Sequence, residues 1–286
     1  MLDADVELVT IRTSGDESST TLPSVLGDKS RFVKELEDAL LRGEIDLAVH
    51  SAKDVPAELP EGLAIVGVPA RADPRDALCG CPALDELPEG ARVGTGSLRR
   101  RSQLLARRPD LRVEELRGNV DTRLRRLAEG GYDALVLAAA GLARLGREEG
   151  EPIDTALMLP AAGQGCLALQ ARAGDSDLAE LAGAVTDRSA LTALTAERAL
   201  VSALDASCHT PLAAYAEVGV EREGGAGGTL RLRAFAGLPD GSHWIGDSLE
   251  GGAAEPAALG RAVAERMLAA GAAEVLAEAE RAAQPR

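Results

Sequence analysis

Two strand-to-helix junctions near the middle of the chain carry clustered arginines that could bind an anion. Residues 93–101 show an apolar strand, a turn of small residues and a helix start with Ser97 as its cap, and residues 116–119 repeat this pattern with Asn119 as the cap. Free N–H groups at a helix start attract anions, and arginine forks add bidentate contacts to carboxylate or phosphate. The Lys-Ser/Thr ending of a P-loop is missing from both, so they do not predict a nucleotide-type phosphate loop.

The arginines at these junctions have two interpretations. Arg99, Arg100 and Arg117 sit where strands meet helices, the place where open α/β sheets hold ligands, and we predict that these three bind an anion. A solvated helix face explains the remaining arginines equally well, namely Arg107, Arg108, Arg125 and Arg126. Genomic codon bias explains the excess of arginine over lysine but not this clustering.

A second candidate site is the polar segment that ends an apolar strand at residues 47–56. It contains His50, Ser51, Lys53 and Asp54 just before a proline. Strand ends can hold titratable groups in a cleft, although an aspartate before a proline also serves simply to form a turn. His50 and Ser51 are adjacent and would point to opposite sides, so the segment does not predict a Ser-His-Asp triad.

A third candidate is Cys208, on a polar loop that follows a helix predicted at 191–204. The neighbouring His209 could favour its thiolate, and the alternative is an idle surface cysteine. Cys166 is expected to pack at the start of a strand. The four cysteines show no zinc-site spacing, which together with the acidic start and the lack of a long apolar run predicts a reducing, cytoplasmic location and no metal.

The elements that must position these residues form a mixed α/β pattern. Strands alternate with helices up to about residue 165, which predicts βαβ units and a largely parallel sheet. From residue 211 antiparallel strands and a closing helix predict a small α+β unit. The expected strands are 45–49, 63–68, 91–95, 113–116, 133–138, 213–220, 230–237 and 244–249, and the expected helices are 32–41, 97–107, 120–129, 191–204 and 256–270.

Length and composition limit the class of protein. The 286 residues suffice for two or three domains, and aromatic residues make up only 2%, which argues against stacking platforms for single-stranded nucleic acid. The net charge of −15 argues against binding to DNA or anionic membranes. Residues 92–126 nevertheless hold eleven arginines and four acidic residues, a net charge of +7, which leaves −22 for the rest. This cluster of arginines in an otherwise acidic protein favours a small polycarboxylate as its ligand.

Taken together, several ordered segments resemble the hydroxymethylbilane synthase (porphobilinogen deaminase) family. Any one segment is weak, but the ordered set is specific and covers residues from about 30 to the end. The segments are FVKELE (32–37), HSAKDVP (50–56), DPRDA (73–77), GTGSLRR (94–100), LRGN (116–119), LPAAGQG (159–165) and the Cys208 loop.

The resemblance implies an enzyme that joins four porphobilinogen molecules head to tail into a linear tetrapyrrole, releasing ammonia each time. It implies a dipyrromethane cofactor held by a thioether to Cys208, and Asp54 as the catalytic carboxylate that stabilises cationic intermediates and relays protons. The acetate and propionate groups of the pyrroles require cationic partners. The resemblance places Lys53, Ser51, Thr95, Ser97, Arg99, Arg100, Arg117 and Gly118 at the cofactor, and Arg123, Arg144, Lys29 and Gln164 at the substrate.

The resemblance also implies three domains, two of them like a type II periplasmic-binding-protein pair and the third a C-terminal α+β domain with a three-stranded antiparallel sheet. Their expected bounds are 1–70 with 167–186, then 71–166, and finally 187–286. A monomer without nucleic-acid or membrane partners is expected.

This chain departs from the family pattern at its beginning. The first strand and helix, with an Arg-x-Ser-Pro-Leu-Ala-like motif, are not found, residues 1–13 match the second strand instead, and the loop 27–31 lacks the usual glycines. A misassigned start and an impaired or repurposed copy both remain open. The alternatives to an active enzyme are therefore a truncated, inactive homologue or a non-catalytic binding protein for a small polycarboxylate, with a nucleic-acid regulator a distant third.

Overall fold

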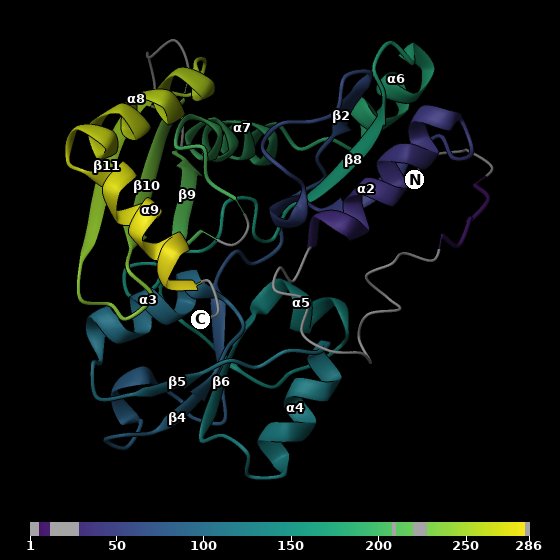
Figure 1. Ribbon diagram of the computed structural model, residues 1–286. Coiled ribbons are helices and arrows are strands. Elements are labelled where there is room, and N and C mark those ends of the chain that lie inside the picture. The colour runs from purple at the N-terminus through teal and green to yellow at the C-terminus, as the bar shows by residue number, and fades with distance from the viewer. Residues whose placement is uncertain (1–5, 12–28, 208–209, 220–227, 284–286) are drawn as a thin grey trace.

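A computed structural model describes residues 6–11, 29–207, 210–219 and 228–283, and its strands form three separate sheets. Figure 1 shows the sheet of residues 212–252 (sheet C) with its helices in one corner of the molecule, the sheet of strands between residues 76 and 152 (sheet B) in a second, and the sheet of residues 48–51, 63–67 and 167–172 (sheet A) in a third. The mixed α/β class and the three-stranded antiparallel C-terminal sheet are confirmed. Each predicted strand up to residue 252 is present within about three residues of its expected bounds.

Sheet A holds the segment that carries Asp54. Its order is β1 (Ala48–Ser51), β8 (Leu167–Arg172) and β2 (Leu63–Gly67), and β8 runs antiparallel to both neighbours. Helices α2 (Lys29–Arg42) and α6 (Ser176–Ala184) pack against this sheet. A single 3-10 turn, η2 (Ala52–Asp54), follows β1 and carries Lys53 and Asp54.

Sheet B carries the arginine-rich junctions. Its strands alternate buried residues between two core clusters, so that Val136 packs on the side of α3 (Leu98–Arg107) and Leu135 on the side of α4 (Val120–Ala128). Helix α5 (Ala139–Arg144) follows directly after the central strand β6. The strand order is β5 (Arg112–Glu114), β4 (Arg92–Gly94), β6 (Ala134–Ala138), β3 (Asp76–Cys79) and β7 (Glu151–Pro152), and a short turn η3 (Leu84–Glu86) precedes β4.

Sheet C forms the C-terminal unit, with the largest core cluster of the chain. Helices α7 and α8 pack tightly together over it because Gly260 lets the backbone of α7 approach closely. The elements are β9 (Leu212–Val218), β10 (Thr229–Gly237) and β11 (Trp244–Gly252), with α7 (Arg188–Ala203), α8 (Pro256–Ala269) and α9 (Ala272–Ala283).

Two expectations were wrong. The sheets are not largely parallel, because only β4–β5 and β4–β6 pair in parallel among the described strands. The chain leaves sheet A after β2, builds sheet B, and returns as β8 between β1 and β2 in the opposite direction, an order that the alternation of elements does not reveal. The described part of the expected N-terminal strand, residues 6–11, forms no strand: Val6 and Leu8 are 77% and 91% exposed, and no described strand pairs with them.

Candidate functional site

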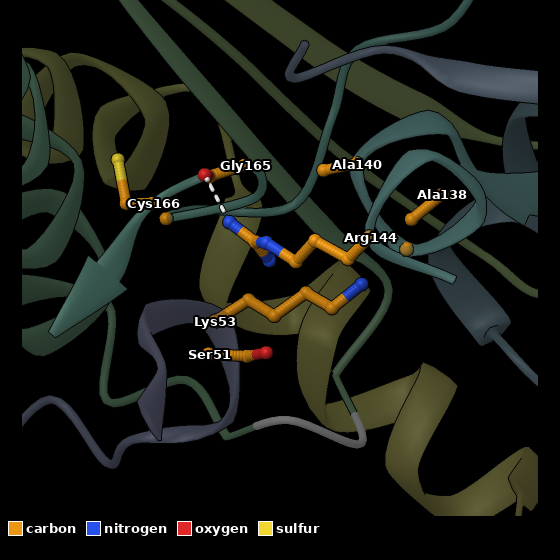
Figure 2. Close-up of a pocket in the computed structure, with 9 residues that line it drawn as sticks. Ser51, Lys53, Ala138, Ala140, Arg144, Gly165 and Cys166 are labelled. Atoms are coloured by element: carbon orange, nitrogen blue, oxygen red, sulfur yellow. Dashed lines mark hydrogen bonds between the residues drawn. The ribbon is translucent and has the colours of Figure 1, made fainter. Parts of the chain in front are cut away.

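A pocket lies where the two crossovers between sheets A and B pass each other. It is lined from sheet A by Ser51 and Lys53 and from the α5 region by Arg144, and the returning crossover lines it between them. Figure 2 shows the Lys53 and Arg144 side chains extending beside one another, with Ser51 on the Lys53 side. The remaining lining residues are Ala138, Ala140, Gly141, Gly163, Gly165 and Cys166. Two cations therefore share a cavity whose other walls are small residues and one thiol.

Glycines let the returning crossover approach the η2 turn. Gly163 has a φ of +72°, and a Cβ there would lie 3.0 Å from the backbone nitrogen of Lys53. Gly165 has a φ of +88°, and a Cβ there would collide with the carbonyl oxygen of Ala72 on the outgoing crossover. Arg144 donates from Nη2 to the Gly165 carbonyl oxygen at 2.9 Å, which joins α5 to the same segment. The two crossovers are thus packed closely against each other, and the returning one also contacts the Lys53 turn and Arg144.

Asp54 is half-buried at the end of η2, directly after Lys53. The segment that follows it is held by Arg198 of α7, which donates to the carbonyl oxygens of Val55, Pro56 and Ala57 at 3.2, 2.7 and 2.9 Å. Burial lowers the pKa of Arg198. A helix of the C-terminal unit therefore holds the three residues that follow the expected catalytic carboxylate in the chain.

At the first junction, the two arginines expected at the cofactor lie inside the protein. Arg99 and Arg100 both bind Asp76, which begins β3 and is fully buried, with Nη–Oδ contacts of 2.7 and 2.8 Å. Arg99 also donates to the Leu159 carbonyl oxygen at 2.5 Å, and Arg100 to that of Val136 at 2.9 Å. Burial would raise the pKa of Asp76, but the two guanidinium charges outweigh it and the pKa is lowered. With a third hydrogen bond, from Nη2 to Asp76 Oδ1 at 3.2 Å, Arg99 uses three of its five N–H groups within the protein.

The turn before these arginines matches its predicted local structure. Ser97 caps α3 by accepting from the backbone N–H of Arg100 at 3.5 Å, and the buried Thr95 accepts from the Ser97 N–H at 3.3 Å. Their expected cofactor contacts stay predictions, as do those of Arg99 and Arg100.

At the second junction, Arg117 faces outward and Arg123 is half-buried. Asn119 caps α4 by accepting from the Thr122 N–H at 2.9 Å. Arg117 is 61% exposed and pairs with the equally exposed Glu115 at 2.6 Å. Arg123 donates to the carbonyl oxygen of Gly118, whose φ is +115°, at 2.7 Å. Burial first, and then the nearby Arg100 charge, lower the pKa of Arg123.

Gln164 joins the pocket to the buried Asp76 pair. Its side chain is 1% exposed; Oε1 accepts from Lys53 Nζ at 3.3 Å, and Nε2 donates to Asp76 Oδ1 at 2.9 Å and to the Pro74 carbonyl oxygen at 2.7 Å. Because Lys53 belongs to sheet A and Asp76 to sheet B, Gln164 bridges both from the crossover between them. Its expected contact with substrate stays a prediction.

A residue that sequence reasoning missed, Glu197 of α7, connects the crossovers to the C-terminal unit. Its fully buried carboxylate binds Arg71 of the outgoing crossover at 2.7 Å and accepts from the Gly163 N–H of the returning one at 2.6 Å. It also accepts from the Ala216 N–H of β9 at 2.8 Å. The available signal was its spacing, since Glu197 lies on the helix face defined by the buried Ala193, Ala196 and Leu200.

Two expected site residues cannot be placed. Cys208 lies outside the described residues, and so does the side chain of Lys29, whose backbone begins α2. In the part of the chain that is described, no three His, Cys, Asp or Glu side chains gather as a metal site, and no helix is long and apolar enough to cross a membrane.

Comparison with known proteins agrees with this arrangement. Residues 1–180 match the family model described as porphobilinogen deaminase, dipyromethane cofactor binding domain, and residues 191–269 match porphobilinogen deaminase, C-terminal domain. The chain belongs to the porphobilinogen deaminase family. Porphobilinogen deaminases of Brevibacillus brevis and Rubrobacter xylanophilus are similar to it, at 47% and 48% identity over 96% and 95% of this chain and 88% and 87% of theirs.

A solved structure, a putative methionine-binding lipoprotein from Bacillus subtilis, aligns with 53% of this chain and 74% of its own at 14% identity and a TM-score of 0.36. An overlap this limited carries no weight for fold or function.

The pocket fits the dipyrromethane group that the porphobilinogen deaminase family implies. A pyrrole unit of this kind carries carboxylates, and the pocket offers the cations Lys53 and Arg144 with the Ser51 hydroxyl. Among the residues that the structure describes, Cys166 is the thiol that lines the pocket. Its burial raises its pKa to about 11, and Figure 2 shows its sulfur directed away from Lys53 and Arg144. Cys166 is therefore a poor attachment point, which agrees with Cys208 in that role.

Proposed function

We propose that this chain is a hydroxymethylbilane synthase, a transferase of tetrapyrrole and haem biosynthesis that condenses four porphobilinogen molecules head to tail. In each round the C–N bond of one aminomethyl group breaks to release ammonia, and a C–C bond forms to the preceding pyrrole, which loses a proton. The observation that carries this conclusion is the pocket that Lys53 and Arg144 both line, next to the Asp54 turn, in a chain of this family.

Asp54 is the carboxylate placed to meet positive charge. It ends η2 next to Lys53, on a backbone that Arg198 fixes from behind. A fixed carboxylate stabilises a developing pyrrole cation because it needs no reorganisation when the charge forms, and it can accept the proton that the coupled carbon loses. When bound, dipyrromethane supplies the nucleophilic pyrrole that starts each chain.

Two groups of cationic side chains bind the carboxylates of the pyrrole units in this proposal. Lys53 and Arg144 line the pocket itself, with Ser51 as a neutral hydrogen-bond partner. Arg117 and Arg123 lie at the outward junction of sheet B, where a lengthening chain brings further carboxylates. Thr95, Ser97, Arg99, Arg100, Gly118, Gln164 and Lys29 keep the cofactor and substrate roles that the family pattern predicts for them.

The proposed domain bounds follow the three sheets. We take sheets A, B and C as the centres of three domains with bounds 1–70 with 167–186, then 71–166, and 187–286, in a cytoplasmic monomer. A non-catalytic binding protein for a polycarboxylate would use the same cations without Cys208 or Asp54.

The mass of the purified protein tests cofactor attachment. We expect a mass above that of the sequence by two pyrrole units and the loss of this increment in Cys208→Ser, because a thioether needs that sulfur. Cys166→Ala serves as the matched control and should keep the increment. An unmodified wild-type mass after incubation with porphobilinogen would contradict the enzyme assignment.

Asp54→Asn tests the catalytic step. We expect the cofactor mass to be retained and kcat for ammonia release to fall by about 10²–10⁴-fold, since the neutral amide neither stabilises a cation nor takes a proton. Glu61→Gln removes an exposed carboxylate from the loop before β2 and should leave kcat unchanged. Near-normal turnover of Asp54→Asn would remove Asp54 from this role.

A further inference from the structure

Three buried polar side chains cross the interface between α2 and sheet A, directly behind the Asp54 turn. Glu37 of α2, Gln170 of β8 and His50 of β1 are 6%, 0% and 6% exposed. Gln170 Nε2 donates to Glu37 Oε1 at 3.0 Å, and Gln170 Oε1 lies 2.8 Å from His50 Nε2. Their surroundings are apolar, with Leu40, Ala48 and Leu63 forming the adjacent core cluster. None of the three has a part in the chemistry described above.

The chain of hydrogen bonds has a defined direction. A carboxylate oxygen of Glu37 accepts, so the NH₂ end of the Gln170 amide faces it, and the carbonyl oxygen of the amide faces His50. A carbonyl oxygen only accepts, so Nε2 of His50 carries the proton. In the neutral ring Nδ1 then has none. The interface selects one tautomer of the imidazole.

The environment also selects the charge of the ring. Burial lowers the pKa of His50 below its ordinary value of 6.5, while the hydrogen bond to Gln170 and the negative charges of Glu37 and Asp54 act in the opposite direction. The groups facing the ring are thus Glu37 from α2, Gln170 from β8 and Asp54 from η2. Burial therefore favours the neutral ring, and the Asp54 charge favours its protonation.

The polar chain has little value for stability alone. Three buried polar groups lose hydration, and their hydrogen bonds to one another largely offset that loss, so the net gain is small. A fully satisfied buried network instead fixes a single arrangement of the elements it joins. Here it joins α2 and β8 to His50 near the end of β1, one residue before Ser51 and four residues before Asp54.

We propose that His50 is a positioning residue for Asp54, held in its Nε2–H tautomer by the hydrogen-bond chain through Gln170 to Glu37. The proposal rests on the catalytic role proposed for Asp54. A neutral ring fixes the end of β1 without competing for the Asp54 carboxylate, whereas an imidazolium would attract that carboxylate and diminish its charge toward the substrate. Because neighbouring residues of a strand alternate faces, His50 acts from the α2 side while Ser51 lines the pocket.

Histidine NMR tests the state of the ring in the full holoprotein. The chain has three histidines, so ¹⁵N ring signals can be assigned by single substitution. We expect the Nε2–H pattern for His50 and a titration midpoint below 6.5. In Glu37→Gln the amide of Gln170 is free to turn, so the fixed pattern should be lost. Glu44→Gln, which removes an exposed carboxylate just past α2, should leave it intact. An Nδ1–H ring or a charged ring at pH 7 in the wild type would overturn the proposal.

The pH dependence of kcat tests whether the charge of His50 affects catalysis. In Gln170→Glu made together with Glu37→Gln, so that no two buried carboxylates face each other, the new carboxylate is an anionic acceptor at Nε2, which should raise the His50 midpoint and move the acid limb of kcat upward by about one pH unit, with KM changed less than about twofold. The control Ala173→Glu adds the same charge at an exposed site just past β8 and should move neither. Should the His50 midpoint move without the acid limb, the proposal fails.

Substitution of His50 separates positioning from simple packing. We expect His50→Leu to lower kcat about tenfold with the cofactor mass retained, and His50→Gln, which still donates to Gln170, to restore most of that loss. In His50→Gln the pH shift caused by Gln170→Glu together with Glu37→Gln should vanish. Equal kcat in His50→Leu and wild type would overturn the inference. A fully active Asp54→Asn would instead overturn the proposed function, so the two failures are distinguishable.

Discussion

The two strand-to-helix junctions of sheet B have the same local design and opposite environments. Both turn from a short strand into a capped helix, with Ser97 and Asn119 accepting from the first-turn N–H groups. At the first, Arg99 and Arg100 are buried against Asp76, while at the second Arg117 is exposed beside Glu115. Whether an arginine in this local pattern is buried or exposed therefore depends on its carboxylate partner. The local pattern does not reveal a partner that lies far away in the sequence.

The difference follows from the position of β3. This strand lies next to β6 and begins with Asp76, which brings a carboxylate under the first junction. Gln164 adds a further hydrogen bond to that carboxylate. The second junction follows β5 at the edge of the sheet and has no such strand beneath it among the described residues. The first junction is thus a rigid base and the second an accessible cationic surface.

The strongest test of this contrast is Asp76→Asn, which leaves two buried guanidinium groups without their anion. We expect the free energy of unfolding to fall by about 3–5 kcal/mol, a large part of the 5–15 kcal/mol typical of a protein. Urea denaturation followed by circular dichroism measures it. Asp73→Asn, which removes a carboxylate paired with the exposed Arg75, should cost less than about 1 kcal/mol. Equal losses would contradict the contrast.

The same pair has a defined pH dependence. Because the folded pKa of Asp76 is below its ordinary value of 3.8, its stabilising contribution is fully present above that value and is lost as pH falls toward the folded pKa. The stability difference between wild type and Asp76→Asn should therefore be constant from pH 5 to 8, and shrink only in stronger acid.

A smaller effect, confined to function, is expected at the second junction. Arg117→Ala should leave the free energy of unfolding within about 0.5 kcal/mol, because the side chain is exposed. It should lower kcat/KM about tenfold, since a charge-assisted hydrogen bond is worth about 1.5–3 kcal/mol. Steady-state kinetics with porphobilinogen measure this. Arg125→Ala, an exposed arginine on the same helix side of the sheet, is the control and should change neither quantity.

The smallest expected effect is that of Glu115→Gln. It releases Arg117 from its exposed partner, so KM should fall by less than about threefold while stability changes by less than about 0.5 kcal/mol. The KM difference should disappear in 1 M salt, where surface charges are screened. A rise in KM would show that Glu115 holds Arg117 in its working position.

Local features were predictable from the sequence, and distant partners were not. The caps at Ser97 and Asn119 depend on neighbouring residues, and both lie where their patterns predict. The strands before them end at Gly94 and Glu114, within about two residues of the expected ends at 95 and 116. The Asp76 carboxylate is 23 residues before Arg99, and the Glu197 carboxylate is 126 after Arg71. Such pairs, and the insertion of β8 between β1 and β2, depend on how the chain returns across the molecule.

The Glu197 carboxylate has a consequence for how the protein folds. It accepts from both crossovers and from β9, so the C-terminal unit supplies the acceptor for groups buried between the other two. A fragment ending before α7 would lose the acceptor of the Arg71 guanidinium and the Gly163 N–H and would expose both groups to water. We therefore expect the three units to unfold together, and the two pieces of a chain divided between β8 and α7 to fold better when mixed than alone.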